Sequence, residues 1–575
     1  MTLHTFQRLG MRTLLAASLL LAQACDMTDL DINTDPNNPL QAGPDLLLSS
    51  VLYSASNTFA GGLNQNAHGF VGILSSADRF DLNNASYNGT WNTLYSGPLK
   101  DLDALLKSTD PSVTDSPHYL GVAQILKAYY FSLMTDLWGD VPYTEAFNGN
   151  AEAQVKFPKY DAGAEIYASA IALLQAGIEN LSKTTPQPID RDADLIYGGR
   201  VALWQKAGRS LLLRLLLQQR RVNDVKGQVE ALLADPSQLI SSASDNFVFQ
   251  FGAQGNLNSQ LDPTHPWYQS AYRGAENGFS YFSHQFMVEM LDNDDPRVPY
   301  YLLRQTSDIL DQDNPTDRQT TPCSQVAGCV YGYIVLNPNM TQRLYGKNPD
   351  ELSDEERDLL AGIFGRDRSD PSGVPLDGSL RTAPATYPAA GLYGEAVSPA
   401  GNNRGAGNGV FPMLTTWMVK FYQIEAILTM GVPGDARAVF EEAMTEAIDY
   451  VANFSSSIST NAPAASGLTE ERDAYVARWL SRYDNAASDG QKLNVVLKQA
   501  WFSNFGNGYE IYNAFRRTGY PNDIQTPVSP TPRNFALRLP YAQDDLTLNQ
   551  NAPQSPPPFD SPDGAVFWDV LKFQS

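Results

Sequence analysis

The sequence predicts a mainly α-helical fold interrupted by a large loop-rich insertion. Long segments of the chain place their apolar residues at helical spacings. Strand-like runs are few and short, at 246–251 and 331–336. Between about 300 and 412, Gly, Pro, Asn and Asp dominate, as is typical of loops. We therefore expect an α-helical scaffold in two sequence halves with the insertion between them.

The clearest helical pattern lies at 119–138, where Gly139 is expected to end the helix. Ser353 and Glu356 are spaced as a capping box for a short helix at 354–362. Further helices are expected at 45–57, 162–181, 201–221, 281–291, 414–430, 435–453, 469–481 and 491–516. Pairs of such helices suggest helical repeats, although the sequence shows no fixed repeat length.

The N-terminus predicts export and a lipid anchor. Arg8 and Arg12 precede an apolar run at 13–22 that is too short to span a bilayer, and Cys25 follows small residues. This pattern predicts a signal peptide at 1–24 and lipidation of Cys25, as in bacterial lipoproteins. The leucine usual in such a cleavage site stands one position early. The alternative is an ordinary secreted protein in which this cysteine is incidental.

The residues after the predicted cleavage site are polar and contain prolines, which predicts a tether at 25–44. Asp29, Asp31 and Asn33 imitate the start of a calcium loop, but the required Gly and Glu are missing, so we interpret them as a solvated turn. The remainder, 45–575, is expected to form a single domain that carries the insertion. With 43% hydrophobic and 11% aromatic residues, the chain can build a large core.

Charge and hydropathy limit the possible partners. The net charge is −23, and loss of the predicted signal peptide, which contains two arginines and no acid, makes it −25. Phosphate backbones would repel such a chain, so no nucleic-acid partner is expected. No apolar stretch after Cys25 is long enough to span a membrane, so the N-terminal lipid would be the only membrane attachment.

Two further cysteines stand close together. Cys323 and Cys329 lie in a loop sequence with Pro and Gly, and in an exported protein they most simply form a disulfide. A metal site would need two more ligands, and no His or Cys is nearby, so no metal is expected there. The disulfide would either present Tyr331 and Tyr333 to a ligand or only staple the insertion.

Five motifs are spread along the chain. The longest is Ile125-Leu-Lys-Ala-Tyr-Tyr-Phe-Ser-Leu-Met-Thr-Asp-Leu-Trp-Gly-Asp-Val-Pro-Tyr-Thr-Glu-Ala. The others, in chain order, are Asp295-Pro-Arg, Gly365-Arg-Asp-Arg with Tyr387-Pro-Ala-Ala-Gly, Asn507-Gly-Tyr-Glu-Ile-Tyr-Asn-Ala-Phe-Arg-Arg-Thr-Gly-Tyr-Pro, and Tyr541-Ala-Gln-Asp-Asp-Leu-Thr-Leu-Asn. In content and order these motifs resemble the SusD/RagB family of outer-membrane nutrient-binding lipoproteins, although Ala542 and Asp545 replace the family's Pro and Glu in the last one. The resemblance covers nearly all of the mature chain.

This resemblance implies a scaffold of tetratricopeptide-like helical pairs that supports a loop-rich ligand face. It also implies a partner, a TonB-dependent transporter barrel of the SusC type, for which the lipoprotein acts as a lid. In that picture the protein captures oligosaccharides or peptides outside the outer membrane and hands them to the barrel. The resemblance implies no catalysis and no cofactor.

The residues of the motifs have structural interpretations. Tyr129, Tyr130 and Trp138 lie on one helical stripe, where aromatic residues usually belong to the core. Glu510 with Arg516 and Arg517 suits an internal ion pair that closes the last helix better than an acid–base pair. Trp91 is expected to begin a core helix. We therefore expect all of these residues to lie outside the ligand site.

Enzyme interpretations have little support. None of the five histidines has a metal-binding spacing such as His-Glu-x-x-His, and no Gly-x-Ser-x-Gly motif is present. The main alternative is a lipid-anchored glycoside hydrolase, which needs only two suitably spaced carboxylates. Asp292, Asp294 and Asp295 cluster at a helix end, where a solvated turn is the favoured interpretation.

A binder of sugars or peptides needs aromatic faces on loops together with polar groups. Arg366 and Arg368 could bind carboxylates, whether of peptide termini or of uronic acids. The candidate ligand-binding aromatics are Phe80 and Tyr87, then Trp267, Tyr268 and Tyr272, and finally Tyr331 and Tyr333. For each of them, packing within the protein or a place on a surface loop is an equally good interpretation.

Overall fold

The computed structural model describes most of the chain after the predicted tether. The described residues are 42–75, 82–149, 154–253, 263–273, 280–305, 345–348, 351–353, 356, 365–369, 382–396, 405–528 and 534–572. Within them the fold is mainly α-helical, as the sequence predicts, and the strands are short.

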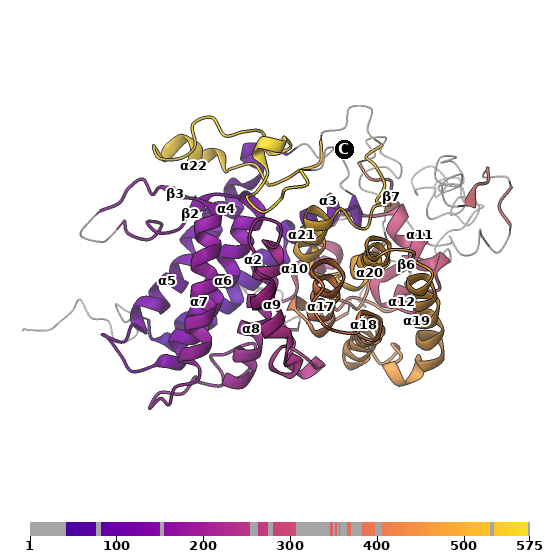
Figure 1. The fold of residues 1–575 in the computed structure, drawn as a ribbon, viewed down its shortest axis with the longest axis horizontal. Coiled ribbons are helices and arrows are strands. Elements are labelled where there is room, and N and C mark those ends of the chain that lie inside the picture. Colours follow the sequence, from indigo (N-terminus) through magenta and orange to yellow (C-terminus); the bar gives the residue numbers. More distant parts are fainter. Residues whose placement is uncertain are drawn as a thin grey trace, which may run out of the picture.

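The helices form two groups on either side of the molecule (Figure 1). The N-terminal group comprises α2 (Pro44–Ala60), α3 (Gly62–Phe70), α4 (Asn88–Ser96), α5 (Pro98–Ser108), α6 (Pro117–Trp138), α7 (Gly163–Asn180), α8 (Val201–Gln218) and α9 (Lys226–Leu233). The C-terminal group comprises α17 (Thr416–Met430), α18 (Ala436–Ile458), α19 (Thr469–Asp484), α20 (Asp489–Ser503) and α21 (Gly508–Thr518). Short helices are α10 (Pro266–Tyr268), α11 (His284–Asp292), α12 (Val298–Tyr301) and α22 (Gln543–Leu548).

Consecutive helices pack against each other as hairpins, which is the arrangement of tetratricopeptide-like scaffolds. In the N-terminal group α6 packs against α7 and α7 against α8, and in the C-terminal group α17 packs against α18 and α18 against α19. The two groups meet where α8 contacts α17 and where α21 contacts α3, near the middle of Figure 1.

Helix α6 lies at the centre of the N-terminal group. Pro117 occupies its first turn, where a missing N–H costs nothing, and Gly139 ends it with φ 83°, a conformation that favours glycine. Its side chains are buried on nearly every face, including those of Tyr129, Tyr130 and Trp138. The prediction that these aromatics belong to the core is confirmed.

The strands of the described residues form four small sheets. They are β1 (Leu74–Ser75), β2 (Val141–Pro142), β3 (Tyr160–Asp161), β4 (Phe247–Gln250), β5 (Tyr281–Ser283), β6 (Leu302–Gln305), β7 (Gly365–Arg366), β8 (Ala383–Pro384), β9 (Glu395–Ala396) and β10 (Val410–Leu414). Their orders are β1-β5-β7, β10-β4, β2-β3 and β8-β6-β9. Three of the four sheets include a strand from the predicted insertion or its edge, so described parts of that region are bound to the scaffold.

Two expected elements differ in the structure. The segment 281–291 begins with strand β5 before it becomes α11, and the helix expected at 491–516 is two helices, α20 and α21. The helix ends between them because Gly506 has φ 100°, a conformation that favours glycine. Asn507 then caps α21 by accepting a hydrogen bond from the Glu510 N–H at 3.3 Å.

Other expectations hold or lie outside the described residues. Strand 246–251 is confirmed by β4, and Ser353 and Glu356 exchange both hydrogen bonds of a capping box. Trp91 lies in α4, is buried, and contacts Trp138 edge to face at 5.4 Å. The strand expected at 331–336 and most of the helix expected at 354–362 are not among the described residues.

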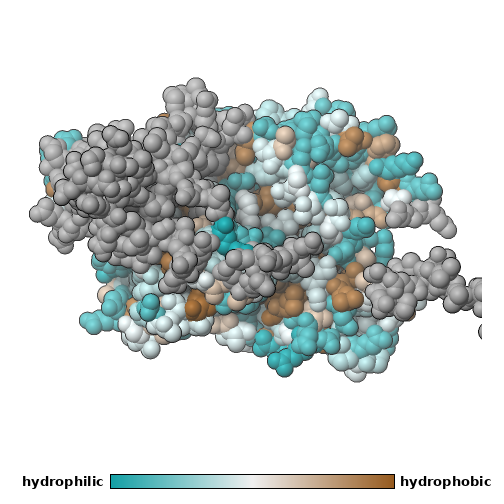
Figure 2. Space-filling model, turned by 180° about the vertical axis from the view of Figure 1, so that it is seen from behind, coloured by the Kyte–Doolittle hydropathy of each residue, from teal (hydrophilic) through white to brown (hydrophobic). Residues whose placement is uncertain are grey.

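The described surface is mixed in character. Figure 2 shows hydrophobic side chains in small separate groups among polar ones on the face seen from behind, as is usual for globular proteins. None of the helices in the described ranges combines the length and the apolar character that crossing a membrane requires.

Candidate functional site

A buried polar network around Asp136 of α6 lies at the centre of the helical scaffold. Its Oδ2 accepts hydrogen bonds from Arg214 Nη2 at 2.9 Å and Asn513 Nδ2 at 2.8 Å. Its Oδ1 accepts from Trp568 Nε1 at 3.0 Å and from the Tyr167 hydroxyl. Because every neighbour of this carboxylate is buried, the network joins α6, α7, α8 and α21 and offers no surface to a ligand.

The expected ion pair of Glu510 with Arg516 and Arg517 is wrong. Glu510 instead accepts from Arg214 Nε at 2.6 Å, and also from the Tyr422 hydroxyl. Arg517 pairs with Glu425 of α17 at 2.7 Å, while Arg516 donates to backbone carbonyl groups. The helix is thus closed by partners on other helices, because α21 is surrounded by them.

Tyr87, one of the predicted ligand aromatics, points into the N-terminal helical group. It is 2% exposed, its ring contacts Trp138 edge to face at 6.0 Å, and its hydroxyl accepts from Asn66 Nδ2 at 3.1 Å. These contacts explain its position by packing.

Trp267, Tyr268 and Tyr272 lie together, as their spacing on one short segment requires, but inside the protein. Tyr268 and Tyr272 stack with centroids 5.2 Å apart and an interplanar angle of 15°. The Tyr272 hydroxyl donates to the Pro384 carbonyl at 2.8 Å, and Trp267 contacts His68 edge to face at 5.2 Å. This cluster holds the predicted insertion against the scaffold.

The two candidate arginines are also enclosed. The guanidinium of Arg366 lies 4.1 Å from the centroid of the Tyr281 ring. Arg368 donates to the carbonyl groups of Gln525 at 2.8 Å and Phe70 at 2.6 Å, and burial lowers the pKa of its guanidinium to about 10. Both side chains serve to fasten strand β7 to its surroundings.

The structure therefore places six predicted site residues inside the protein. A ligand would reach them only after neighbouring segments had moved, so their contact with a ligand stays a prediction. The other predicted residues lie outside the described ranges; they are Phe80, Tyr331, Tyr333, Cys25, Cys323 and Cys329. No cluster of potential metal ligands occurs within the described residues.

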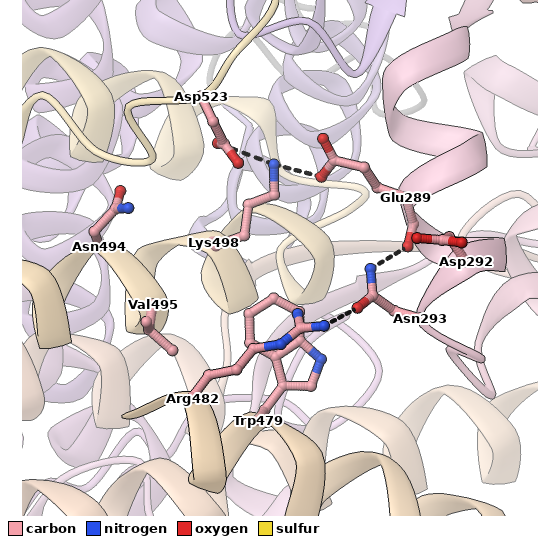
Figure 3. A pocket seen from close by; sticks show the side chains of 9 residues that line it. All are labelled: Glu289, Asp292, Asn293, Trp479, Arg482, Asn494, Val495, Lys498 and Asp523. Atoms are coloured by element: carbon pink, nitrogen blue, oxygen red, sulfur yellow. Dashed lines mark hydrogen bonds and ion pairs between the residues drawn. The ribbon is translucent and has the colours of Figure 1, made fainter. Parts of the chain in front are cut away.

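The described part of the chain contains a polar pocket on the C-terminal helical group. It has a volume of about 270 Å³ and opens between α11, α19, α20 and the segment that follows α21 (Figure 3). Its lining residues are Glu289, Asp292, Asn293, Trp479, Arg482, Asn494, Val495, Lys498 and Asp523. Of these, sequence reasoning singled out only Asp292, because the others are scattered over more than 200 positions of ordinary helical sequence.

Lys498 forms one wall of this pocket and is held from several sides. Its ammonium pairs with Glu289 at 2.5 Å and with Asp523 at 3.0 Å, as Figure 3 shows. It also lies 4.4 Å from the centroid of the Trp501 ring. Burial raises the pKa of the Glu289 carboxyl, and the charge of Lys498 opposes that rise.

Trp479 and Arg482 form the opposite wall. The guanidinium of Arg482 lies 4.3 Å from the centroid of the Trp479 ring and donates to Asn293 Oδ1 at 2.6 Å. Asn293 in turn donates to the backbone carbonyl of Glu289 at 2.6 Å (Figure 3). This chain of contacts fixes the wall from α19 to the end of α11.

The three aspartates at the end of α11 differ in exposure and in their partners. Asp294 is 82% exposed and lies in the solvated turn that the sequence predicts. Asp295 is buried and paired with Arg297 at 2.6 Å, so the solvated-turn interpretation is wrong for this residue. Only Asp292 faces the pocket.

Comparisons with known proteins agree with this architecture. A family model described as "Starch-binding associating with outer membrane" matches residues 36–333, just over half of the chain, and one described as "Susd and RagB outer membrane lipoprotein" matches 413–561. No protein of curated function matches the chain by sequence.

Solved structures share the whole fold at low sequence identity. A Bacteroidetes SusD-like protein is 19% identical with a TM-score of 0.66, covering 92% of this chain and 100% of its own. A SusD homologue of Bacteroides fragilis is 17% identical with a TM-score of 0.63, over 93% and 100% of the two chains. A chitin-binding protein is 19% identical with a TM-score of 0.61, over 92% and 100%.

Proposed function

Since the chain belongs to the SusD-like family of outer-membrane lipoproteins, we propose that it binds nutrient oligomers at the cell surface and passes them to a SusC-type TonB-dependent transporter. The observation that carries this proposal is the match of the family models to both helical groups. The N-terminal sequence supports it, because a lipid on Cys25 would hold the protein at the outer membrane.

Among nutrient oligomers, glycans are favoured over peptides. One family model is described as starch-binding and one structure of the same fold as chitin-binding. The net charge of −23 disfavours strongly anionic polysaccharides, so neutral glycans are the first candidates.

The proposed role is binding without catalysis. Among the described carboxylates, Asp136, Glu425, Asp295 and Glu510 are buried and each is paired with an arginine, so none is free to act as a general acid. Asp136 and Glu510 come from the family motifs and Asp295 from the aspartate cluster, whereas Glu425 is the partner of Arg517.

Binding and catalysis are separated by incubating the full chain with oligosaccharides and peptides, measuring affinity and product formation together. The proposal expects binding without turnover. Hydrolysis that disappears when a carboxylate pair is substituted would instead establish the glycoside hydrolase.

The partnership with a transporter is tested by purifying the chain from its native outer membrane with mild detergent. The proposal expects a TonB-dependent barrel to copurify in stoichiometric amount, identified by mass spectrometry. Exposure to added protease on intact cells tests the outward orientation. Purification with no barrel from membranes that contain one would contradict the lid role.

A further inference from the structure

We propose that the pocket between α11, α19 and α20 is a binding site for one neutral, hydroxyl-rich ring, such as a hexopyranose unit of an oligosaccharide. This inference rests on the proposed function for the nature of the ligand, but it places binding on the helical scaffold and not on the predicted loop aromatics. It therefore adds a site that no motif of the sequence indicated.

The size of the pocket suits a single ring. Its volume of about 270 Å³ is just below the range of roughly 300–1,000 Å³ that is usual for pockets enclosing drug-sized ligands. A longer segment of an oligomer would have to extend out of the opening, with one unit seated inside.

The charged groups of the walls favour a neutral ligand. Three carboxylates and two cations line the pocket, an excess of one negative charge, so an anionic sugar would be repelled. Lys498 is already matched by Glu289 and Asp523. Asp292 and Arg482, in contrast, form no ion pair with the described residues, and Asn293 accepts from only one of the Arg482 N–H groups, so both side chains can contact a ligand.

These groups offer acceptors and donors side by side. The Asp292 carboxylate accepts hydrogen bonds, while the remaining N–H groups of Arg482 and the Nδ2 of Asn494 donate them. The Asn494 oxygen is occupied, since it accepts from the Asn522 N–H at 3.0 Å, and this bond orients the amide. A hydroxyl group both donates and accepts, so a ring bearing several hydroxyls can satisfy such a mixed wall.

Trp479 supplies a second, independent indication of a ligand. Its side chain is 4% exposed, and its indole N–H has no acceptor among the described residues. A buried donor without an acceptor is costly and is uncommon in native proteins. Because Trp479 lines the pocket, a hydroxyl oxygen of the proposed ring would supply the missing acceptor.

The walls are fixed before a ligand arrives. Arg482 is held by the Trp479 ring and Asn293, and Lys498 by two carboxylates and the Trp501 ring. Little side-chain freedom is therefore lost on binding, which favours affinity. The lining comes from helices and a connecting segment and includes none of the described strands, so a peptide could not bind here by extending a sheet.

The test measures binding of small probes to the full chain by ligand-observed NMR and titration calorimetry. The neutral probes are glucose, galactose and N-acetylglucosamine, glucuronate is the anionic probe, and trialanine is the peptide probe. For one ring we expect a Kd on the order of 1 mM for at least one neutral probe. Thermal melting of every variant verifies that it is folded.

Two variants alter the pocket and one is a matched control. Asp292→Asn removes the negative charge and replaces one of the two acceptor oxygens by an NH2 donor, which should weaken binding by about tenfold. Val495→Phe should abolish binding by filling the space. Asp294→Asn is the control, because it makes the same chemical change two positions further along the chain. The Asp294 side chain is 82% exposed and lies outside the pocket. It should leave Kd unchanged.

Every other outcome overturns the proposal. Neutral sugars that bind all variants equally would mean that the site lies elsewhere, while the proposed nutrient binding would survive. Binding confined to glucuronate or trialanine and lost in Val495→Phe would refute the neutral ring as ligand. If no neutral sugar binds, the site assignment fails, and only a further failure of every oligosaccharide and peptide would also remove the proposed function.

Discussion

Asp136 and Arg214 form an ion pair inside the helical scaffold, with Oδ2 and Nη2 2.9 Å apart and both side chains 1% exposed. Arg214 also pairs with Glu510 at 2.6 Å, so one guanidinium on α8 neutralises carboxylates from α6 and α21. This arrangement ties the signature helix to the C-terminal half of the chain. The network stabilises the fold only while all three charged side chains are present, because a buried charge that has lost its partner is very unfavourable.

We therefore expect Arg214→Met to lower the free energy of unfolding by at least about 3–5 kcal/mol, since it leaves two buried carboxylates without their cation. Urea unfolding followed by circular dichroism measures this change. The matched control is Arg437→Met, whose pair with Asp484 is about half exposed at 45% and 46%, so water screens it and the substitution should change stability far less. Equal effects in the two variants would contradict this account.

The sequence was sufficient to predict the scaffold but not the partners within it. Helix 119–138 was predicted almost to its observed bounds, Pro117–Trp138, because periodicity, Gly139 and the motif agree locally. The partner of Glu510 was not predictable, because Arg214 lies 296 positions away and is one of many arginines. The sequence also predicted α20 and α21 as one helix, because the apolar periodicity continues across the break at Gly506.

The candidate site, too, could not be predicted from local sequence. Tyr268 and Tyr272 occur in a polar, Pro-containing sequence that suggests an exposed loop, yet they stack on each other inside the protein. Tertiary contacts decide burial there. The pocket was missed because Trp479, Lys498 and Asp523 come from separate elements and each fits an ordinary helix or loop when considered alone.

The crossing of α6 and α7 depends on two glycines that face each other. A Cβ on Gly177 would lie 2.8 Å from the carbonyl oxygen of Gly121, which is closer than real contacts allow. Gly177→Ala should therefore lower the free energy of unfolding by about 1–3 kcal/mol as the helices are pushed apart. Gly227→Ala is the control, since nothing lies within 4 Å of its Cβ in α9, and it should be neutral or stabilise by up to about 1 kcal/mol. Destabilisation by the control alone would refute the close-packing argument.

We expect the predicted lipid on Cys25 to decide where the protein resides. Cys25→Ser should shift the chain from the membrane fraction to the soluble fraction, because the apolar run before it is too short to remain as a membrane span. Fractionation and intact-mass measurement of the mature chain record the change. Ser18→Ala, inside the apolar run, is the control and should leave the protein lipidated. An unlipidated wild-type protein that still fractionates with membranes would contradict the anchor.

His68 of α3 should make stability depend on pH. Its Nδ1 lies 2.7 Å from the Asn64 carbonyl oxygen and its Nε2 lies 3.2 Å from the Gly506 nitrogen, so the ring donates through Nδ1 and accepts through Nε2. Only the neutral ring can do both. Burial accordingly lowers the pKa of His68 to about 4.

A folded-state pKa below the unfolded value means that the unfolded chain binds more protons between about pH 6.5 and pH 4. The stabilisation is therefore complete above about pH 6.5 and decreases on acidification, by about 2 kcal/mol at pH 5 for this one group. Urea unfolding near pH 7 and near pH 5 measures the difference. In His68→Gln this part of the pH dependence should vanish, although the variant is less stable throughout, whereas the half-exposed His118→Gln should retain it. An unchanged slope in His68→Gln would place the pH sensitivity elsewhere, with the buried His265, whose pKa is lowered to about 3 by burial, as the next residue to substitute.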